Sequence, residues 1–330
     1  MDTSARFQIL SLDGGGIKGL FAAAILAQVE DDLNIRVCDH FDLITGTSTG
    51  GIIALGLGMG LRPREIVQFY VSECGNIFGD KLGYRGLFRL WRRKFSEQPL
   101  ASALKRCFGE RRLADCVKPV VIPSFNLDRN DVYLFKTPHH PRLTRDWKVP
   151  LWKVALATSA APTYFASCQE VDHIRLIDGG VWANNPAMVG VVEAYSMFGK
   201  PLESIAVLSL GATSPTVERP KSLTNGGMFQ WRAAGMDVAL RGQSCGVQAQ
   251  VLHLLGPDRG IRLDAVVADG VFALDRLTEP RLLSEAAMTS RTFSPTFTTH
   301  FQPHIAAQYT PLQPAGQHAA LAGATPAFAT

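Results

Sequence analysis

Short apolar runs alternate with alanine-rich or amphipathic segments over the first two-thirds of the 330-residue chain. Apolar runs of four to eight residues bounded by glycine predict buried strands, and longer segments rich in Ala and Leu predict helices. We expect strands near 7–12, 41–45, 119–126, 131–136, 174–178 and 204–211. Helical patterns follow most of them, which predicts an α/β fold of three layers (α/β/α) with a mostly parallel central sheet.

The pattern loosens after Gly211, where helices are expected only near 228–255 and 275–290. From Thr292 to Thr330 the chain has no Asp, Glu, Lys or Arg, and its last twenty residues are rich in Ala, Pro and Gly. Such composition is typical of poorly ordered segments. We therefore expect three parts: a catalytic domain at 6–212, a helical extension of the same fold at 213–291, and a partly disordered tail at 292–330, anchored around 293–309.

Composition narrows the class of protein. Hydrophobic residues make up 46% and charged residues 19%, which permits a sizeable core, and the net charge of +4 is too small to indicate a nucleic-acid polymer as partner. The six cysteines are scattered without a CxxC pair, as in a reducing compartment, so no metal or cofactor is expected. With no signal peptide and no apolar run of about 18 residues, we expect a cytoplasmic protein that contacts the inner membrane only peripherally.

The stretch FDLITGTSTGGIIAL places Ser48 between glycines, where a predicted strand gives way to a predicted helix. A serine on such a turn stands clear of the backbone, as in a nucleophile elbow, and the helix start favours negative charge there. A G-x-S-x-G match alone is also compatible with an ordinary tight turn in which the serine caps the helix. The motif makes Ser48 a candidate nucleophile.

The stretch DGGGIKG, Asp13 to Gly19, follows the first predicted strand. Successive glycines allow backbone N–H groups to converge on one small volume, which can hold a phosphate or an oxyanion. Gly14, Gly16 and Gly19 also have the spacing of a dinucleotide fingerprint, although the usual acidic residue about 20 positions later is not evident. A non-enzymatic nucleotide-binding module is therefore one alternative.

The stretch LIDGGVWANNP places Asp178 at the end of an apolar strand. An aspartate before two glycines can simply form a turn. It can also serve as a general base beside a nucleophile, provided that burial or crowding raises its pKa from the ordinary value near 3.9.

The motifs DGGGIKG, GTSTGG, SAAPTYF and DGGVWANNP, in this order, resemble those of the patatin-like phospholipase family over roughly residues 6–212. The resemblance implies a phospholipid acyl hydrolase that uses a Ser-Asp dyad, with Ser48 as nucleophile and Asp178 as base. It implies an oxyanion hole in the loop Gly14–Gly16, where the amides of Gly15 and Gly16 donate and Gly14 shapes the turn. A Ser-His-Asp esterase or peptidase is the second alternative, and His253 is its best-placed histidine.

Residues 84–95, YRGLFRLWRRKF, interleave basic and aromatic side chains, which suits anionic lipid, a nucleotide phosphate or a solvated loop. In size and layout the chain is similar to bacterial patatin-like effectors of antiphage defence. That similarity implies a phospholipid membrane as substrate and a cyclic nucleotide as activator. The oligomeric state is left open.

Overall fold

The computed structural model describes residues 6–79, 95–211, 221–264 and 278–312. Its centre is a seven-stranded sheet in the order β4-β3-β2-β1-β6-β7, with β5 paired to β3. The β1–β2, β2–β3, β1–β6 and β6–β7 pairs are parallel, whereas β4 and β5 pair antiparallel with β3. The strands are β1 Phe7–Leu12, β2 Leu43–Gly46, β3 Val120–Asn126, β4 Asp131–Lys136, β5 Leu176–Asp178, β6 Ile205–Gly211 and β7 Gly260–Asp264. The predicted α/β class with a mostly parallel sheet is confirmed.

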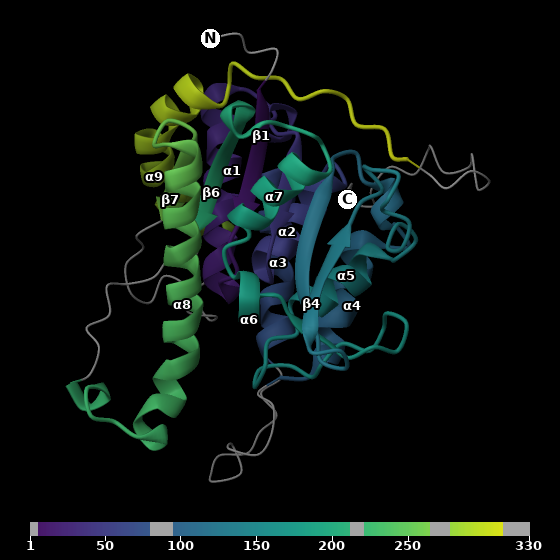
Figure 1. Cartoon of the computed structure of the whole chain (residues 1–330), viewed down its shortest axis with the longest axis vertical. Coiled ribbons are helices and arrows are strands. Elements are labelled where there is room, and N and C mark those ends of the chain that lie inside the picture. Colours follow the sequence, from purple (N-terminus) through teal and green to yellow (C-terminus); the bar gives the residue numbers. More distant parts are fainter. Residues whose placement is uncertain (1–5, 80–94, 212–220, 265–277, 313–330) are drawn as a thin grey trace.

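Helices cover both faces of the sheet (Figure 1). One layer holds α1 Leu20–Leu33, α2 Thr49–Gly58, α3 Pro63–Gly79, α4 Glu97–Phe108, α5 Leu151–Thr158 and α9 Glu279–His300; the other holds α6 Gly180–Ala183, α7 Ala187–Ser196 and α8 Met228–Leu255. Every residue of β1, β2 and β6 is buried, as expected for parallel strands covered on two sides. The sheet thus separates two apolar clusters, one under each helical layer.

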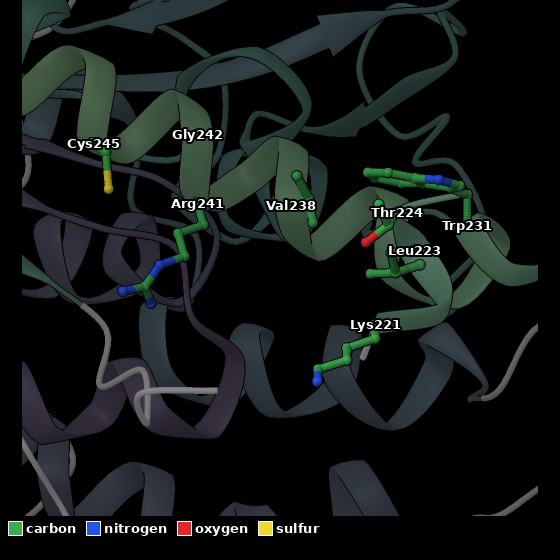
Figure 2. Close-up of a pocket in the computed structure, with 8 residues that line it drawn as sticks. All are labelled: Lys221, Leu223, Thr224, Trp231, Val238, Arg241, Gly242 and Cys245. Carbon is green, nitrogen blue, oxygen red and sulfur yellow. The ribbon is translucent and has the colours of Figure 1, made fainter. Parts of the chain in front are cut away.

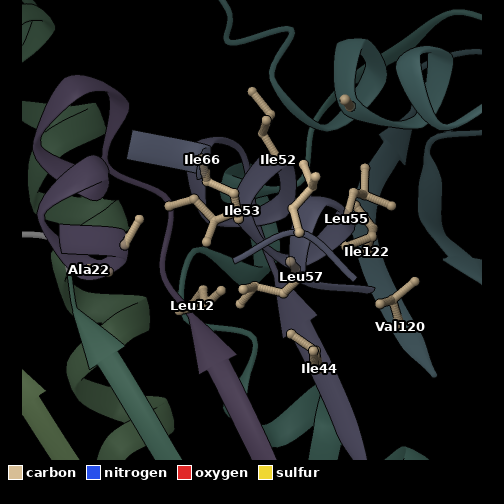
Figure 3. Packing of buried hydrophobic residues seen from close by; sticks show 14 of the residues in the cluster. Leu12, Ala22, Ile44, Ile52, Ile53, Leu55, Leu57, Ile66, Val120 and Ile122 are labelled. Atoms are coloured by element: carbon tan, nitrogen blue, oxygen red, sulfur yellow. The ribbon is translucent and has the colours of Figure 1, made fainter. Parts of the chain in front are cut away.

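The larger cluster surrounds α2, the helix that follows Ser48 (Figure 3). Its side chains come from β1, β2, β3 and the helices above them, and those drawn include Leu12, Ile44, Ile52, Ile53, Leu55, Leu57, Ile66, Val120 and Ile122. All ten residues of α2 are buried, so this helix has no solvated face. A helix held in this way fixes the turn before it within a densely packed interior.

The C-terminal region differs from the expectation. Residues 292–300, which were expected to begin the tail, instead form the end of α9, which continues to His300. Phe293, Phe297 and Phe301 are buried against the core. Their spacing of four puts these rings on one helix face, and Phe297 and Phe301 contact Phe41. The chain beyond α9 is also held, because His304 Nε2 lies 2.7 Å from Asp42 Oδ2. Residues 313–330 lie outside the described ranges.

Candidate active site

Ser48 occupies a strained turn between β2 and α2. Its φ of 55° and ψ of −123° lie in a region that L-residues rarely adopt, at a cost of about 1–3 kcal/mol. The turn is tight because a Cβ at Gly46 would overlap the carbonyl oxygen of Gly50, and one at Gly50 would overlap that of Leu12. The glycines of the motif are therefore required for close backbone approach, and the positive φ is typical of a nucleophile elbow.

Neighbouring threonines hold the elbow in place. Thr158, the last residue of α5, accepts a hydrogen bond from the Ser48 amide at 3.1 Å and donates from the same hydroxyl to the carbonyl of Pro123 at 2.6 Å. Thr47 donates to the carbonyl of Ala183 at 2.6 Å. Both threonines are fully buried. Sequence reasoning gave Thr158 no role, since it lies 110 positions from Ser48 and belongs to no chemical motif.

Asp178 ends β5, which pairs antiparallel with β3 and brings its carboxylate to the elbow. The side chain is only 5% exposed, and its Oδ1 accepts a hydrogen bond from the Gly180 amide at 2.7 Å. Burial raises the pKa of Asp178 to about 6, while hydrogen bonds from the Gly180 amide and the Ser48 hydroxyl oppose the rise. The fold therefore brings Ser48 and Asp178 together across 130 positions of sequence, with the carboxyl pKa close to neutral.

The three glycines of the loop Gly14–Gly16 differ in what their backbone amides contact. The Gly14 amide donates to the carbonyl of Asn184 at 2.9 Å, so this N–H is already used. This bond agrees with the expectation that Gly14 shapes the turn of the loop and does not itself donate to an oxyanion. Gly15 is half-buried and Gly16 is exposed, with a left-handed φ of 55°. Both border the same cavity as Ser48, where their amides can meet a ligand.

A cavity of about 1070 Å³ opens beside the elbow. Ser48, Asp178, Gly15 and Gly16 line one part of it. Its apolar wall comes from α2, α3, α4 and the loop after α5, and includes Ile52, Tyr70, Ile77, Phe95, Leu100 and Phe165. No histidine is among the described residues that line it. A site of this shape can bind an extended apolar chain with a reactive group next to Ser48.

Helix α8 forms the opposite side of the cavity through Leu240, Ser244, Gln248 and neighbouring residues. Asn184 donates to Ser244 at 3.0 Å, and the Asn185 amide donates to Gln243 at 2.9 Å. These bonds join α8 to the loop that follows Asp178. His253, the histidine of the triad alternative, is exposed near the end of α8 and does not line the cavity. Residues 84–94 of the basic aromatic stretch lie outside the described ranges.

A serine on a strand–helix elbow beside a buried carboxylate, facing an apolar cavity, is the arrangement expected of a serine hydrolase. The family model described as patatin-like phospholipase matches residues 10–191. The match covers more than half of the chain, so this protein belongs to the patatin-like phospholipase family, and the predicted resemblance is confirmed.

Three curated relatives are each named cGAMP-activated phospholipase. The Escherichia coli protein is 37% identical over 66% of this chain, the Vibrio cholerae protein 40% over 58%, and the Pseudomonas aeruginosa protein 32% over 82%. The matched regions span 65%, 58% and 83% of those relatives' own lengths, respectively. In the described part of the chain, no helix is long and apolar enough to cross a membrane.

Proposed function

We propose that this protein is a serine acyl hydrolase that cleaves phospholipid esters through a Ser48–Asp178 dyad. The placement of Ser48 beside the buried Asp178 carboxylate in one cavity, where the serine hydroxyl lowers the pKa of that carboxyl, carries the proposal, because it brings a candidate nucleophile to a base. A carboxylate with a pKa of about 6 is mostly ionised at neutral pH and basic enough to accept a proton in the transition state. The elbow exposes the hydroxyl to the cavity where an ester would lie.

The reaction is a double displacement. Ser48 Oγ attacks the ester carbonyl carbon while its proton passes to Asp178, and the carbonyl electron pair forms an oxyanion that the Gly15 and Gly16 amides stabilise. The tetrahedral intermediate expels the alcohol of the lysophospholipid, which takes the proton from Asp178. Water then attacks the acyl-serine, gives a proton to Asp178, and releases the fatty acid as Ser48 regains its proton.

The walls of the cavity favour a lipid substrate. Aliphatic and aromatic side chains beside Ser48 provide the burial that an acyl chain needs, worth about 0.8 kcal/mol for each CH₂ removed from water. At the cavity's edge Val181, Met236 and Leu252 are 37%, 51% and 43% exposed. Exposed apolar groups at the mouth of an apolar site suit peripheral contact with a bilayer, where the substrate lies.

Activation by a cyclic nucleotide is the second part of the proposal, supported by the similarity to three relatives named cGAMP-activated phospholipase. A hollow of about 590 Å³ on α8 offers matching chemistry: Lys221 and Arg241 can face phosphates, and Trp231 offers a ring for a base (Figure 2). Arg241 and Cys245 line both this hollow and the catalytic cavity. A ligand there would contact residues that also border the active site.

The dyad is tested by fatty-acid release from phosphatidylglycerol–phosphatidylethanolamine vesicles, with and without cGAMP. Ser48→Ala and Asp178→Asn should each lower release by about 10³-fold or more, because either change removes the activated nucleophile. Ser204→Ala, a serine remote from the cavity, should retain it. Covalent labelling of Ser48 by a fluorophosphonate, located by mass spectrometry, is the second readout. Fatty-acid release by Ser48→Ala at the wild-type rate would exclude the proposed reaction.

The activator is tested separately. Titration with cGAMP should quench Trp231 fluorescence, identified by comparison with Trp231→Phe. Lys221→Ala, at a residue that lines the hollow and not the catalytic cavity, should weaken stimulation by cGAMP while its hydrolysis of a soluble ester without cGAMP stays near that of the wild type. Undiminished stimulation in this variant would place the activator elsewhere or exclude it.

A further inference from the structure

Asp13, the residue before the glycine loop, is held by an arginine from the far edge of the sheet. Its side chain is 2% exposed, and Arg262 on β7 donates to both carboxylate oxygens, at 3.0 Å to Oδ1 and 2.7 Å to Oδ2. Arg262, 14% exposed, also donates to Ser209 at 2.7 Å and to Asp264 at 2.8 Å. A bidentate pair of this kind fixes orientation as well as charge.

The register of the sheet produces this contact. Ser11 on β1 lies opposite Ser209 on β6, and Ser209 lies opposite Arg262 on β7, so the three residues form one row across parallel strands. Asp13 comes two positions after Ser11, where side-chain alternation returns to the same face. The arginine therefore extends along the carboxyl ends of β6 and β1. It lies 249 positions after Asp13, beyond the region 10–191 that the family model matches.

We propose that Arg262 is a positioning residue of the active site: it fixes the glycine loop through Asp13 and neutralises that carboxylate beside the forming oxyanion. The inference rests on the proposed hydrolase function. Asp13 is two residues before Gly15, so their Cα atoms are at most about 7.6 Å apart. An uncompensated carboxylate at that range would oppose the negative charge of the transition state, by about tenfold or more in rate at an effective dielectric constant near 20.

The ionisation of Asp13 should make the effect of Arg262 on turnover depend on pH. Burial raises the pKa of Asp13 to about 6 even though Arg262 lowers it by charge and hydrogen bonding. The other groups facing Asp13 are Asp264 of β7, which raises the pKa, and Ser244 of α8, which lowers it. Without the guanidinium the pKa of Asp13 rises further. An Arg262→Gln enzyme would then carry a neutral Asp13 near pH 7 and an unpaired charge only at more alkaline pH.

The experiment compares the wild type with Arg262→Gln, Arg262→Lys and Asp13→Asn/Arg262→Gln over pH 5 to 10. A soluble ester is used, and released acid is quantified by chromatography. Arg262→Gln should show a new alkaline fall in kcat of about tenfold or more with little change in KM. Arg262→Lys should show a smaller fall, since an ammonium compensates charge without the bidentate fork. In the double variant the alkaline fall should disappear, because no carboxylate is left to ionise.

A merely structural role makes different predictions. Loss of packing would lower activity at every pH, and removal of Asp13 would not restore it. An Arg262→Gln profile parallel to that of the wild type, or an alkaline fall that persists in the double variant, would overturn the inference. Should Arg262→Gln fail to fold, as breaking a buried ion pair can cause, the Arg262→Lys enzyme carries the test: no alkaline fall there overturns it.

The result is separable from the proposed function. An inactive Ser48→Ala enzyme together with an unchanged Arg262→Gln profile would defeat only the role of Arg262. An active Ser48→Ala enzyme would defeat the serine mechanism whatever Arg262 does. Fluorophosphonate labelling of Ser48 in each variant, with thermal melting as a folding control, distinguishes the two cases.

Discussion

Two buried carboxylates line the same cavity at the ends of different strands: Asp178 is the last residue of β5, and Asp13 directly follows β1. Burial is the largest influence on both and raises each pKa to about 6. Their partners differ: Asp13 faces the Arg262 guanidinium, whereas Asp178 accepts from the neutral Gly180 amide and Ser48 hydroxyl. A carboxylate held only by neutral donors can take up a proton without breaking an ion pair. Equal burial is therefore compatible with a base at Asp178 and an anchor at Asp13.

The backbone beside Asp178 is also packed differently from the backbone beside Asp13. A Cβ at Gly179 would overlap the carbonyl oxygen of Pro123 on β3, which cannot move without the sheet. A Cβ at Gly14 would meet Asn184 Oδ1 at 2.7 Å, the end of a side chain that can rotate, and would lie 3.3 Å from Ser48 Cβ. Gly179→Ala should therefore displace Asp178, lowering turnover by more than about 100-fold and stability by about 3 kcal/mol or more, while Gly14→Ala should cost less stability.

Fatty-acid release and urea unfolding measure the two effects. Gly75→Ala is the matched control, because a Cβ there meets nothing within 4 Å and Gly75 lies inside α3; removing a helical glycine should leave stability equal or slightly higher. If Gly14→Ala lowered stability as much as Gly179→Ala, the backbone would be equally rigid beside Asp13 and beside Asp178.

Part of this arrangement could be predicted from the sequence and part could not. Ser48 and Asp178 were predictable because glycine-flanked residues at strand ends mark turns where side chains stand free. Arg262 was not, since a lone arginine in GIRLD is ordinary strand composition and only the sheet register brings it to Asp13. The use of the Gly14 amide by Asn184 likewise depends on tertiary contact.

The C-terminal third shows the same limit. The helix at 228–255 was predicted and is confirmed as α8. The expected boundary at 291 fell too early, because lack of charge favoured a tail although Phe293, Phe297 and Phe301 recur every four residues in the segment 293–309 that was expected to anchor it. That spacing is typical of a helix with one aromatic face.

The pH dependence of turnover tests which carboxylate is the base. The proposed base Asp178 would act in its ionised form, so kcat/KM on a soluble ester should fall about tenfold per pH unit below about 6, the pKa to which burial raises this group. Asp13 titrates in the same range, so the wild-type profile alone is ambiguous. The acid fall should persist in Asp13→Asn. If the acid fall disappeared in Asp13→Asn while circular dichroism showed a folded enzyme, the base would be Asp13 and not Asp178.

The smallest expected effect concerns stability. Because the folded-state pKa of Asp178 is raised from 3.8 to about 6, its protonated form favours folding below about pH 4, and that contribution is lost as the pH rises through 6. At pH 7.5 the buried charge therefore costs about 1–3 kcal/mol. Asp178→Asn removes the charge and keeps an oxygen for the Gly180 amide, so urea unfolding should show an increase in stability at pH 7.5 that vanishes near pH 4. Asp13→Asn also removes a buried charge, but it leaves the Arg262 guanidinium without its bidentate partner, so its gain in stability at pH 7.5 should be smaller than that of Asp178→Asn. Equal gains for the two variants would show that the guanidinium does not distinguish these carboxylates.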